Sequence, residues 1–383
     1  MKKIIVIGAG ISGLFFANLL RKDHNYDITV YEKNNSINLD KGYGIQLSVN
    51  SIKLLNKIGF QDIKPEQKFY PNKLDFYSLK NNKKISDLNI SVFNEEDIKY
   101  TTLSRLTLIK FLKDKLPSNF INYNRKVTKV NYHKDKIELS FEDNLLVECD
   151  YLIVSDGVFS ATKSLIADKE IKPKYFNSVA IRANIEKKFI KEIDYSNISL
   201  FLGSNLHSVT YPIDKSNEFS FISILRKSLT KEEINNYSLS NNKIFISSIL
   251  SEISKQVKPN IIDNLKNIKC FPIFVSKEIY HPKNKNIFLI GDAFFALPPT
   301  FAQGASQSIE VAFELYENLK NNTSKFNKQR FKRIKMINNK SKINYFVFHL
   351  SNPLITFIRN VTMKYLFKNK RFINSYLGKI YKD

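Results

Sequence analysis

Cysteine is scarce in this sequence. Cys149 and Cys270 are the only two cysteines in 383 residues, and they form neither a CxxC pair nor a metal-ligand spacing. The sequence therefore predicts no metal site. The two side chains are typical of buried, reduced thiols in a cytoplasmic protein.

Tryptophan is absent, but other apolar residues are plentiful. The chain contains 30 Phe and 19 Tyr, and hydrophobic residues make up 43% of it. This composition excludes wholesale disorder and predicts a packed interior. A chain of 383 residues is long for one core, so two interleaved domains with a short tail are expected.

Acidic residues are outnumbered: 36 Asp and Glu face 60 Lys and Arg, which gives a formal net charge of +24. A field of this sign would attract anionic substrates, phosphates, acidic lipid or nucleic acid. The alternative is a general bias towards Lys and Asn, since these residues are scattered over most surface-like stretches. No stretch has the clustering of a nucleic-acid module, so no nucleic-acid partner is expected.

An uninterrupted hydrophobic segment is also missing from the N-terminus. The uncharged run from Ile4 to Leu20 follows Lys2 and Lys3, as in a signal peptide or membrane anchor. Glycines at positions 8, 10 and 13 interrupt the run where such a segment would need bulk. The stretch is better interpreted as a strand, a turn and a helix.

The first thirty residues predict a βαβ unit. The apolar run Lys3–Ile7 predicts a strand buried on both faces, Ile11–Arg21 a helix and Asp27–Tyr31 a second strand. The turn GAGISG between the first two matches GxGxxG, in which the first glycine makes the turn, the second leaves room for a pyrophosphate and the third permits close helix packing. Glu32 ends the second strand, where an acidic residue would bind a ribose diol. These residues predict a dinucleotide site and leave NAD and FAD both open.

Later segments predict an α/β fold with a discontinuous Rossmann-like parallel sheet. Tyr151–Val154 and Ile287–Ile290 read as further strands of this sheet, and Ile137–Phe141 with Leu145–Cys149 as a hairpin. The alternating runs of an inserted β-rich substrate domain are expected at 69–100 and 176–280. The domain that holds the dinucleotide would comprise 1–68, 101–175 and 281–325. The remaining residues, 326–383, predict a basic helical segment with Phe346, Val347, Leu350, Ile355 and Ile358 as apolar contacts.

Several stretches resemble one known family. DYLIVSDGVFSATK at 150–163 and NIFLIGDAFFALPPTFAQGASQSIE at 286–310 resemble the Asp-Gly and Gly-Asp segments of FAD-dependent aromatic hydroxylases of the para-hydroxybenzoate hydroxylase type. GYGIQLSVNSIKLLNKIGF at 42–60 and FHLSNPLITFIRN at 348–360 are similar to the salicylate-hydroxylase branch. With the N-terminal unit, these stretches span nearly the whole chain in the expected order.

The resemblance implies FAD as cofactor and assigns roles to individual residues. Asp292 would accept hydrogen bonds from the ribityl chain, Arg105 would lie beside the flavin and its phosphates, and Asp156 would lie near the pyrophosphate. Backbone N–H groups at the start of the helix after Gln303 would face the flavin pyrimidine. The full set of expected cofactor-binding residues is Gly8, Gly10, Ser12, Gly13, Glu32, Lys33, Arg105, Asp156, Asp292, Gly304, Ala305 and Ser306.

The sequence also departs from the family's pattern. Phe294 and Phe295 stand where Ala-His is usual, Ala302 replaces a Gly before Gln303, and Lys163 replaces a common arginine. The Phe pair is expected to make the substrate cavity more apolar, which would disfavour a standard phenolic substrate.

The resemblance implies a monooxygenase that uses NADH or NADPH and O2 to hydroxylate a small aromatic or conjugated substrate through a flavin C4a-hydroperoxide. Pro298 would stiffen the loop over the flavin and Gln303 would contact the ring or substrate. Arg182, His207 and Tyr211 are substrate-side candidates, with His207 as a possible base for a phenol. Two alternatives stay open. One is an oxidase or reductase acting on a lipid or isoprenoid, with membrane-surface contact through the basic tail. The other is a non-catalytic flavin-binding module.

Overall fold

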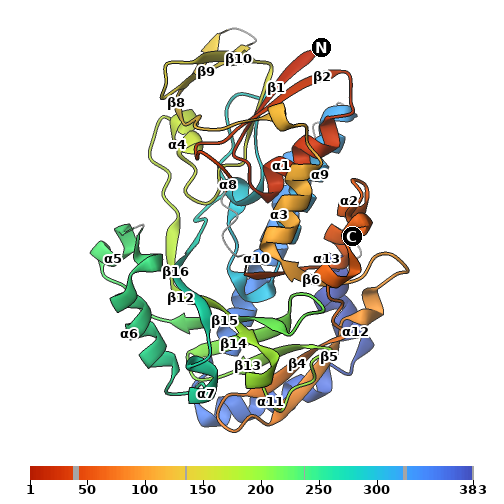
Figure 1. The fold of residues 1–383 in the computed structure, drawn as a ribbon, viewed down its shortest axis with the longest axis vertical. Helices are drawn as coiled ribbons and strands as arrows, with labels where there is room; N and C mark the ends of the chain where they lie inside the picture. The colour runs from red at the N-terminus through yellow and green to blue at the C-terminus, as the bar shows by residue number, and fades with distance from the viewer. Residues whose placement is uncertain (38–42, 134–135, 237, 322–325, 382–383) are drawn as a thin grey trace.

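The structure, a computed structural model, describes residues 1–37, 43–133, 136–236, 238–321 and 326–381. Gly42, the first residue of the stretch 42–60 that carries part of the family resemblance, lies outside this description. Figure 1 shows a parallel sheet at one end of the molecule and a larger sheet at the other, with long helices between and around them. The predicted α/β fold with a helical C-terminal segment is confirmed.

The first sheet is parallel throughout and contains every strand that the sequence predicted for it. Its strand order is β17-β11-β1-β2-β7. The five strands are β1 (Lys2–Ile7), β2 (Tyr26–Tyr31), β7 (Ile121–Asn122), β11 (Tyr151–Val154) and β17 (Ile287–Leu289). Ile4, Ile5 and Val6 of β1 are fully buried, because β1 is the central strand and elements pack on both faces of the sheet.

Helices from distant parts of the chain pack together beside this sheet. Helix α1 lies against α3 and α9, and its Leu14, Phe15 and Phe16 are all fully buried. A helix that is apolar on all sides in this way is stable only inside a core. The helices of this part are α1 (Ile11–Leu20), α2 (Val49–Asn56), α3 (Arg105–Asp114), α4 (Ala161–Ala167), α8 (Gly291–Phe295) and α9 (Gly304–Lys320).

The second sheet has seven strands in the order β16-β12-β15-β14-β13-β4-β5. Its neighbours are antiparallel except for the parallel pair β13 and β4. The strands are β4 (Lys73–Ser78), β5 (Lys84–Asn89), β12 (Lys174–Glu186), β13 (Ile198–Leu202), β14 (Leu206–Pro212), β15 (Glu218–Arg226) and β16 (Lys266–Val275).

The two faces of this sheet have different surroundings. Val179 and Ile181 of β12 belong to the core cluster that contains Phe245 and Ile249 of α6 (Lys243–Ile253). The alternate residues Ala180 and Arg182 line a cavity on the opposite face. This alternation follows from the two-residue period of a strand. The short helices α5 (Lys231–Asn235) and α7 (Pro259–Ile262) flank α6.

Two small sheets complete the β structure. The expected hairpin is present as β9 (Lys136–Phe141) and β10 (Leu146–Cys149), extended by β8 (Val127–His133) into three antiparallel strands. A second pair, β3 (Gly44–Leu47) and β6 (Thr101–Ser104), lies between the two large sheets.

The C-terminal segment forms α10 (Phe326–Phe348), α11 (Pro353–Leu366), α12 (Lys370–Ile373) and α13 (Lys379–Tyr381). Its expected apolar contacts are only partly right. Phe346, Ile355 and Ile358 are 62%, 46% and 54% exposed, because they point away from the core to which the helices attach. Among the helices of the described residues, none has both the length and the apolar character needed to cross a membrane.

A buried ion cluster fastens this segment to α9. The side chain of Arg330 is 0% exposed, and its Nη1 lies 3.0 Å from Oε2 of Glu310, while Nη2 of Arg333 lies 2.6 Å from Oε1 of the same carboxylate. Burial acts to raise the pKa of Glu310, but the two arginines outweigh it and hold that pKa below its ordinary value. Glu310 is therefore ionised and paired in the neutral pH range.

We expect Arg330→Met to lower the free energy of unfolding by about 3 kcal/mol, because it leaves a buried carboxylate with fewer partners. Lys126→Met is the control, since Lys126 bridges Glu142 at the surface with side chains 54% and 65% exposed. Such a surface pair contributes at most about 1 kcal/mol. Urea denaturation of both variants tests the cluster, and equal small losses would contradict its role as a clamp.

Candidate active site

The glycine turn after β1 is built as the motif predicts. Gly8 has φ +102°, and a Cβ there would lie 2.7 Å from the carbonyl oxygen of Ser155. A Cβ on Gly13 would meet the carbonyl oxygen of Gly8 and the hydroxyl of Ser155, which follows the neighbouring strand β11. Each glycine is thus required by close backbone packing at the carboxyl edge of the sheet.

Open space lies beside this turn. A Cβ added to Gly10 or to Gly157 would have no heavy atom within 4 Å among the described residues. Gly10 is the N-cap of α1, and no side chain caps the helix or places an acid in its first turn. The first N–H groups of α1 are therefore available to an anion.

This open space is part of a groove of about 290 Å³, and two carboxylates border it. Glu32 accepts hydrogen bonds from the backbone N–H of Ala9 at 2.9 Å and of Asn34 at 3.0 Å, which fix its position after β2. Asp156 accepts from the N–H of Thr162 with Oδ2, while its buried Oδ1 has no partner in the described part of the chain. Lys33 lies on the same groove.

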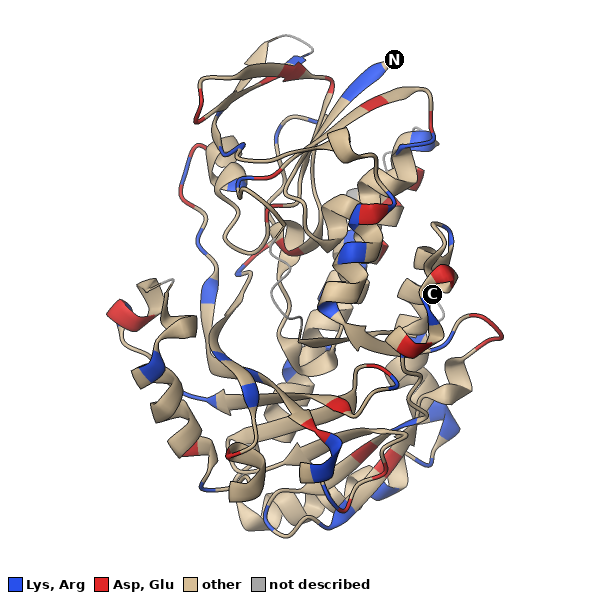
Figure 2. Ribbon diagram, viewed as in Figure 1, with Lys and Arg blue, Asp and Glu red and all other residues tan. Residues whose placement is uncertain are grey.

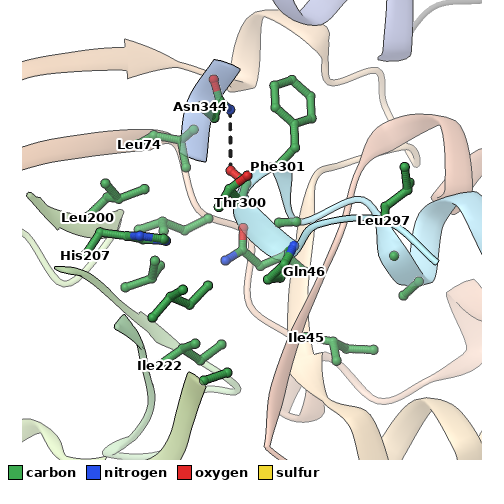
Figure 3. A pocket seen from close by; sticks show the side chains of 18 of the residues that line it. Ile45, Gln46, Leu74, Leu200, His207, Ile222, Leu297, Thr300, Phe301 and Asn344 are labelled. Carbon is green, nitrogen blue, oxygen red and sulfur yellow. Dashed lines mark hydrogen bonds between the residues drawn. The ribbon is translucent and has the colours of Figure 1, made fainter. Parts of the chain in front are cut away.

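A second cavity of about 320 Å³ lies between the parallel sheet and the open face of the seven-stranded sheet. Its walls come from the seven-stranded sheet, from β3, from the loop before α9 and from the C-terminal helices. Figure 3 shows Leu200, His207 and Ile222 on one side of this space and Ile45 and Leu297 on the other. Most of its wall is aliphatic or aromatic.

Charged groups gather at the end of this cavity nearest the parallel sheet. Asp292, which follows β17, lies deep in the protein yet is exposed to the cavity that it lines. Burial raises the pKa of Asp292 to about 6, with a smaller opposing effect from Arg105. Burial, and then the neighbouring charge of Arg182, lower the pKa of Arg105, while Asp292 partly compensates. The three groups thus interact across the site.

The N-terminus of α9 opens onto the same end of the cavity. Gly304 and Ala305 line it, and a Cβ on Gly304 would have no atom within 4 Å among the described residues. The helix has no side-chain cap and no acid in its first turn. Ala302, two residues earlier, has φ +51° and directs the chain into the helix. Non-glycine residues rarely adopt this left-handed conformation.

The three substrate-side candidates come together on the wall formed by the large sheet. Arg182 extends from β12, and His207 and Tyr211 extend from β14. Tyr211 is fully buried, and its hydroxyl makes no hydrogen bond in the described part of the chain. Burial raises the pKa of this hydroxyl, so it is protonated at neutral pH. Burial, with a contribution from His349, lowers the pKa of His207 well below its usual range.

Four other predicted site residues are not among the described residues that line the cavity. Pro298 is buried and is not among the described lining residues. Gln303 is also buried: its Nε2 donates to the hydroxyl of Ser48 at 3.1 Å and its Oε1 accepts from Gln307 at 3.1 Å. Ser306 directs its hydroxyl to Ser48 and Ser51 as well. Ser12 is buried beside Gly291.

The structure corrects the expectation for Phe294 and Phe295. Both belong to the core cluster of the parallel sheet, where the ring of Phe294 lies 6.5 Å from that of Phe326. Neither is among the described residues that line the cavity, so the pair does not make the cavity more apolar. Lys163, which replaces the usual arginine, is buried and donates to the carbonyl oxygen of Ala293 at 3.1 Å.

Sequence reasoning missed part of the cavity wall. Gln46 lies on β3 and accepts from the hydroxyl of Tyr100 at 2.8 Å. Asn344 of α10 accepts from the hydroxyl of Tyr376 at 2.7 Å and also contacts the carbonyl oxygen of Thr300 (Figure 3). Gln46 lies in a stretch that carried the family resemblance, which could have pointed to it. Asn344 had no such signal.

These features fit FAD. Two helix N-termini without side-chain caps, open space at Gly10, Gly157 and Gly304, and a carboxylate oxygen of Asp156 without a partner among the described residues are found in the groove and in the cavity. The carboxyl edge of an open α/β sheet is where dinucleotides bind. The residues would hold the pyrophosphate at α1 and the flavin between Asp292 and α9.

Comparison with known proteins gives the same assignment. Residues 1–325 match the family model described as FAD binding domain. The chain is 25% identical over 323 residues to 6-hydroxynicotinate 3-monooxygenase from Pseudomonas fluorescens, covering 83% of this chain and 82% of that protein.

Solved structures share the whole fold. HpxO from Klebsiella pneumoniae, complexed with FAD and uric acid, matches with a TM-score of 0.81 and 19% identity over 98% of this chain and 95% of HpxO. A salicylate hydroxylase substrate complex matches with a TM-score of 0.77 and 16% identity over 97% of this chain and 98% of that one.

We expect Gly10→Glu to abolish flavin retention, because the new carboxylate would occupy the open space at the start of α1 and repel a pyrophosphate. Asp292→Ala should weaken retention severely. His24→Glu, which adds a carboxylate to an exposed site after the same helix, is the control and should bind normally. The flavin-to-protein absorbance ratio after purification measures the effect. Full flavin content in both site variants, with normal circular dichroism, would refute this placement.

We expect Ala302→Gly to raise the free energy of unfolding by about 1 kcal/mol, since glycine adopts a positive φ without the cost that alanine incurs. Ala296→Gly, at φ −81° in the same loop, should instead lower stability by about 0.5–1 kcal/mol. Denaturation of both apoproteins provides the comparison, and a loss of stability in both would show that Ala302 is not strained.

Proposed function

The chain belongs to the FAD binding domain family, and we propose that this FAD-dependent monooxygenase uses NAD(P)H and O2 to hydroxylate a small aromatic acid. One observation supports the proposal above the others. A single cavity brings the expected flavin-side residues, Asp292 and Gly304, together with the substrate-side residues Arg182, His207 and Tyr211.

FAD supplies the redox and oxygen chemistry when it is bound, so the protein must bind, orient and exclude water. The backbone N–H groups at the start of α9 would stabilise negative charge at that end of the cavity. Aliphatic and aromatic side chains from the seven-stranded sheet and from the C-terminal helices keep water away from the substrate. Tyr211 offers a buried hydroxyl, close to Gln46 and Ser220, that can hydrogen-bond to a polar substituent.

The charges of the cavity favour an acidic substrate. Among the described lining residues, the charged ones are Arg182 and Asp292, and Asp292 lies on the side assigned to the flavin. Arg105 adds a second positive charge nearby. The guanidinium of Arg182 is left to bind a carboxylate or another anionic group. The names 6-hydroxynicotinate and salicylate, which two similar proteins carry, describe ring compounds of this kind.

The two sheets also support a division of the chain. We propose that residues 1–68, 101–175 and 281–325 form the unit that holds FAD, and that residues 69–100 and 176–280 form the unit that holds the substrate. The buried, unpaired thiols of Cys149 and Cys270 are consistent with work in the cytoplasm.

The test is NAD(P)H oxidation in air by the flavin-loaded protein with a panel of aromatic acids and their neutral amides. We expect an acid to stimulate oxidation and to yield a product that contains one added oxygen. Oxidation that no panel member stimulates would argue against a hydroxylase of small aromatic acids.

The variant Arg182→Met tests the acid preference. It should raise KM for the acid by about tenfold to a hundredfold, as expected for a lost hydrogen bond to a charged group. KM for the matched amide should change little. Equal effects on acid and amide would remove the assigned role of Arg182.

A second proposal concerns the C-terminal helices, which we infer to contact an anionic membrane surface. On α11 the exposed apolar residues recur on one face, with Leu354 68%, Phe357 66% and Tyr365 74% exposed. Their spacing follows the helical period. Further exposed apolar side chains on these helices are Ile343, Phe346, Ile355, Ile358 and Val361.

The charge of this segment supports anionic lipid as the occupant of this face. From residue 326 onward the sequence has Asp383 as its only acid among many lysines and arginines, and Figure 2 shows Lys and Arg distributed around these helices. A second copy of the same face would bring like charges together. Anionic lipid offers the opposite charge, at about 1 kcal/mol per basic residue near the surface, and accepts apolar side chains between headgroups.

We expect the protein to sediment with vesicles containing phosphatidylserine at physiological salt and not with pure phosphatidylcholine. Leu354→Glu with Phe357→Glu should abolish the binding. Ile244→Glu, at an apolar residue of α6 that is 83% exposed, is the matched control and should bind as the unchanged protein does. Loss of a dimer rather than of vesicle binding in the double variant would show that a second copy covers this face.

A further inference from the structure

Two buried histidines meet at the wall of the substrate cavity. His207 of β14 lines the cavity and is 2% exposed, and Figure 3 shows its ring among the aliphatic side chains on that side. Its Nδ1 lies 2.9 Å from Nε2 of His349, the residue that follows α10. His349 is 1% exposed, so water does not reach the contact freely. The two nitrogens must share a single proton in a hydrogen bond.

Neighbouring aromatic rings hold both imidazoles in place. The ring of Phe348 packs edge-on to His207 at a centroid distance of 5.4 Å, and Tyr345 packs edge-on to His349 at 4.3 Å. The hydroxyl of Tyr345 is in turn bonded to Ser178 and Arg226. This packing limits reorientation of the two imidazole rings. The groups that the ring nitrogens contact therefore determine which nitrogen carries the proton.

The tautomer of His349 follows from a carbonyl group. Its Nε2 also lies 3.1 Å from the carbonyl oxygen of Ile224, and a carbonyl oxygen only accepts hydrogen bonds. Nε2 must therefore carry the proton. The other ring nitrogen, Nδ1, is buried with no partner among the described residues. A bare lone pair at that position is tolerated more readily than an N–H group without an acceptor.

The tautomer of His207 follows from that of His349. Two N–H groups cannot face each other across 2.9 Å. Because Nε2 of His349 carries a proton, Nδ1 of His207 carries none and acts as the hydrogen-bond acceptor. Burial and the neighbouring His349 keep the pKa of His207 well below its usual range, and burial, the carbonyl contact of Ile224 and the charge of Arg226 together set the pKa of His349 at about 4. Both rings are therefore neutral at physiological pH.

We propose that His349 is a positioning residue that holds His207 as the Nε2–H tautomer, so that His207 donates a hydrogen bond to the substrate and does not remove a proton from it. The inference rests on the proposed hydroxylase function for its substrate. It assigns to that substrate a hydrogen-bond acceptor beside His207, such as a carbonyl oxygen, a phenolate oxygen or a ring nitrogen. A substrate that must lose a phenolic proton at this position fits the site poorly.

The tautomer can be measured without turnover. The chain has five histidines, and the other three, His24, His133 and His281, are exposed. In a two-bond nitrogen–proton correlation spectrum of the flavin-loaded protein labelled with ¹⁵N-histidine, we expect His207 and His349 to give the pattern of a fixed Nε2–H tautomer. The exposed histidines should give averaged signals and provide the internal reference. A spectrum in which His207 carries its proton on Nδ1 would overturn the proposal.

Variants of His349 separate positioning from simple packing. Glutamine at this site keeps an N–H group towards His207, whereas glutamate offers only acceptors and would draw the proton of His207 to Nδ1. We expect His349→Gln to preserve the Nε2–H signal of His207 and His349→Glu to shift it. If both variants leave the signal of His207 unchanged while the protein stays folded, His349 does not set the tautomer.

Kinetics then decide between a donor and a base. His207→Gln retains an N–H donor but cannot accept a proton as imidazole does. If His207 donates, kcat/KM for the best acid should fall by less than about tenfold. If it acts as a general base, the loss should be about a hundredfold to ten-thousandfold, and the proposal fails. A protein without any substrate-stimulated oxidation would refute the proposed function but would leave the spectroscopic result intact.

Discussion

The shape of the substrate cavity depends on the buried ion cluster that joins α9 to the C-terminal segment. Arg330 and Arg333 bind Glu310 inside the protein, and Arg330 also donates to Gln307. Gln307 contacts Gln303, which contacts Ser48 at the start of α2. A buried polar network of this kind is stable only when its members keep their partners. It therefore fixes the N-terminus of α9, and with it the end of the cavity where negative charge would be stabilised.

Most of the fold was predictable because the central strands have strong local signals. β1, β11 and β17 are nearly continuous apolar runs, and β2 alternates Asp27 and Thr29 with the buried Ile28 and Val30. The glycine turn has a spacing that few other structures require. β7 has only two residues, which is too short for any periodic pattern. β16 was also missed, since its apolar residues are interrupted by lysine and proline and its partner β12 lies some ninety positions earlier in the chain. Pairing between strands that are so far apart in the sequence produces no local pattern in either strand.

The candidate site was likewise predictable only in part. Gly8, Gly10, Gly13 and Glu32 could be named from spacing, whereas Asp156 and Asp292 were implied by the family resemblance. Arg182, His207 and Tyr211 could be named because they lie on predicted strands of the second domain. The family resemblance implied that Gln303 contacts the flavin or the substrate, but its amide is bonded to Ser48 and Gln307. Phe294 and Phe295 looked like substitutions in the cavity, but they fill the core. Which way a side chain points depends on packing partners that the sequence does not name.

The last part of the chain completes the cavity: Asn344, Phe348, Tyr376 and Tyr381 all line it. These residues lie beyond the stretch that matches the family model, which ends at residue 325. The cavity is therefore closed by helices that pack against the two sheets without being strands of either. Substitutions on these helices can change the shape of the cavity while both sheets stay intact.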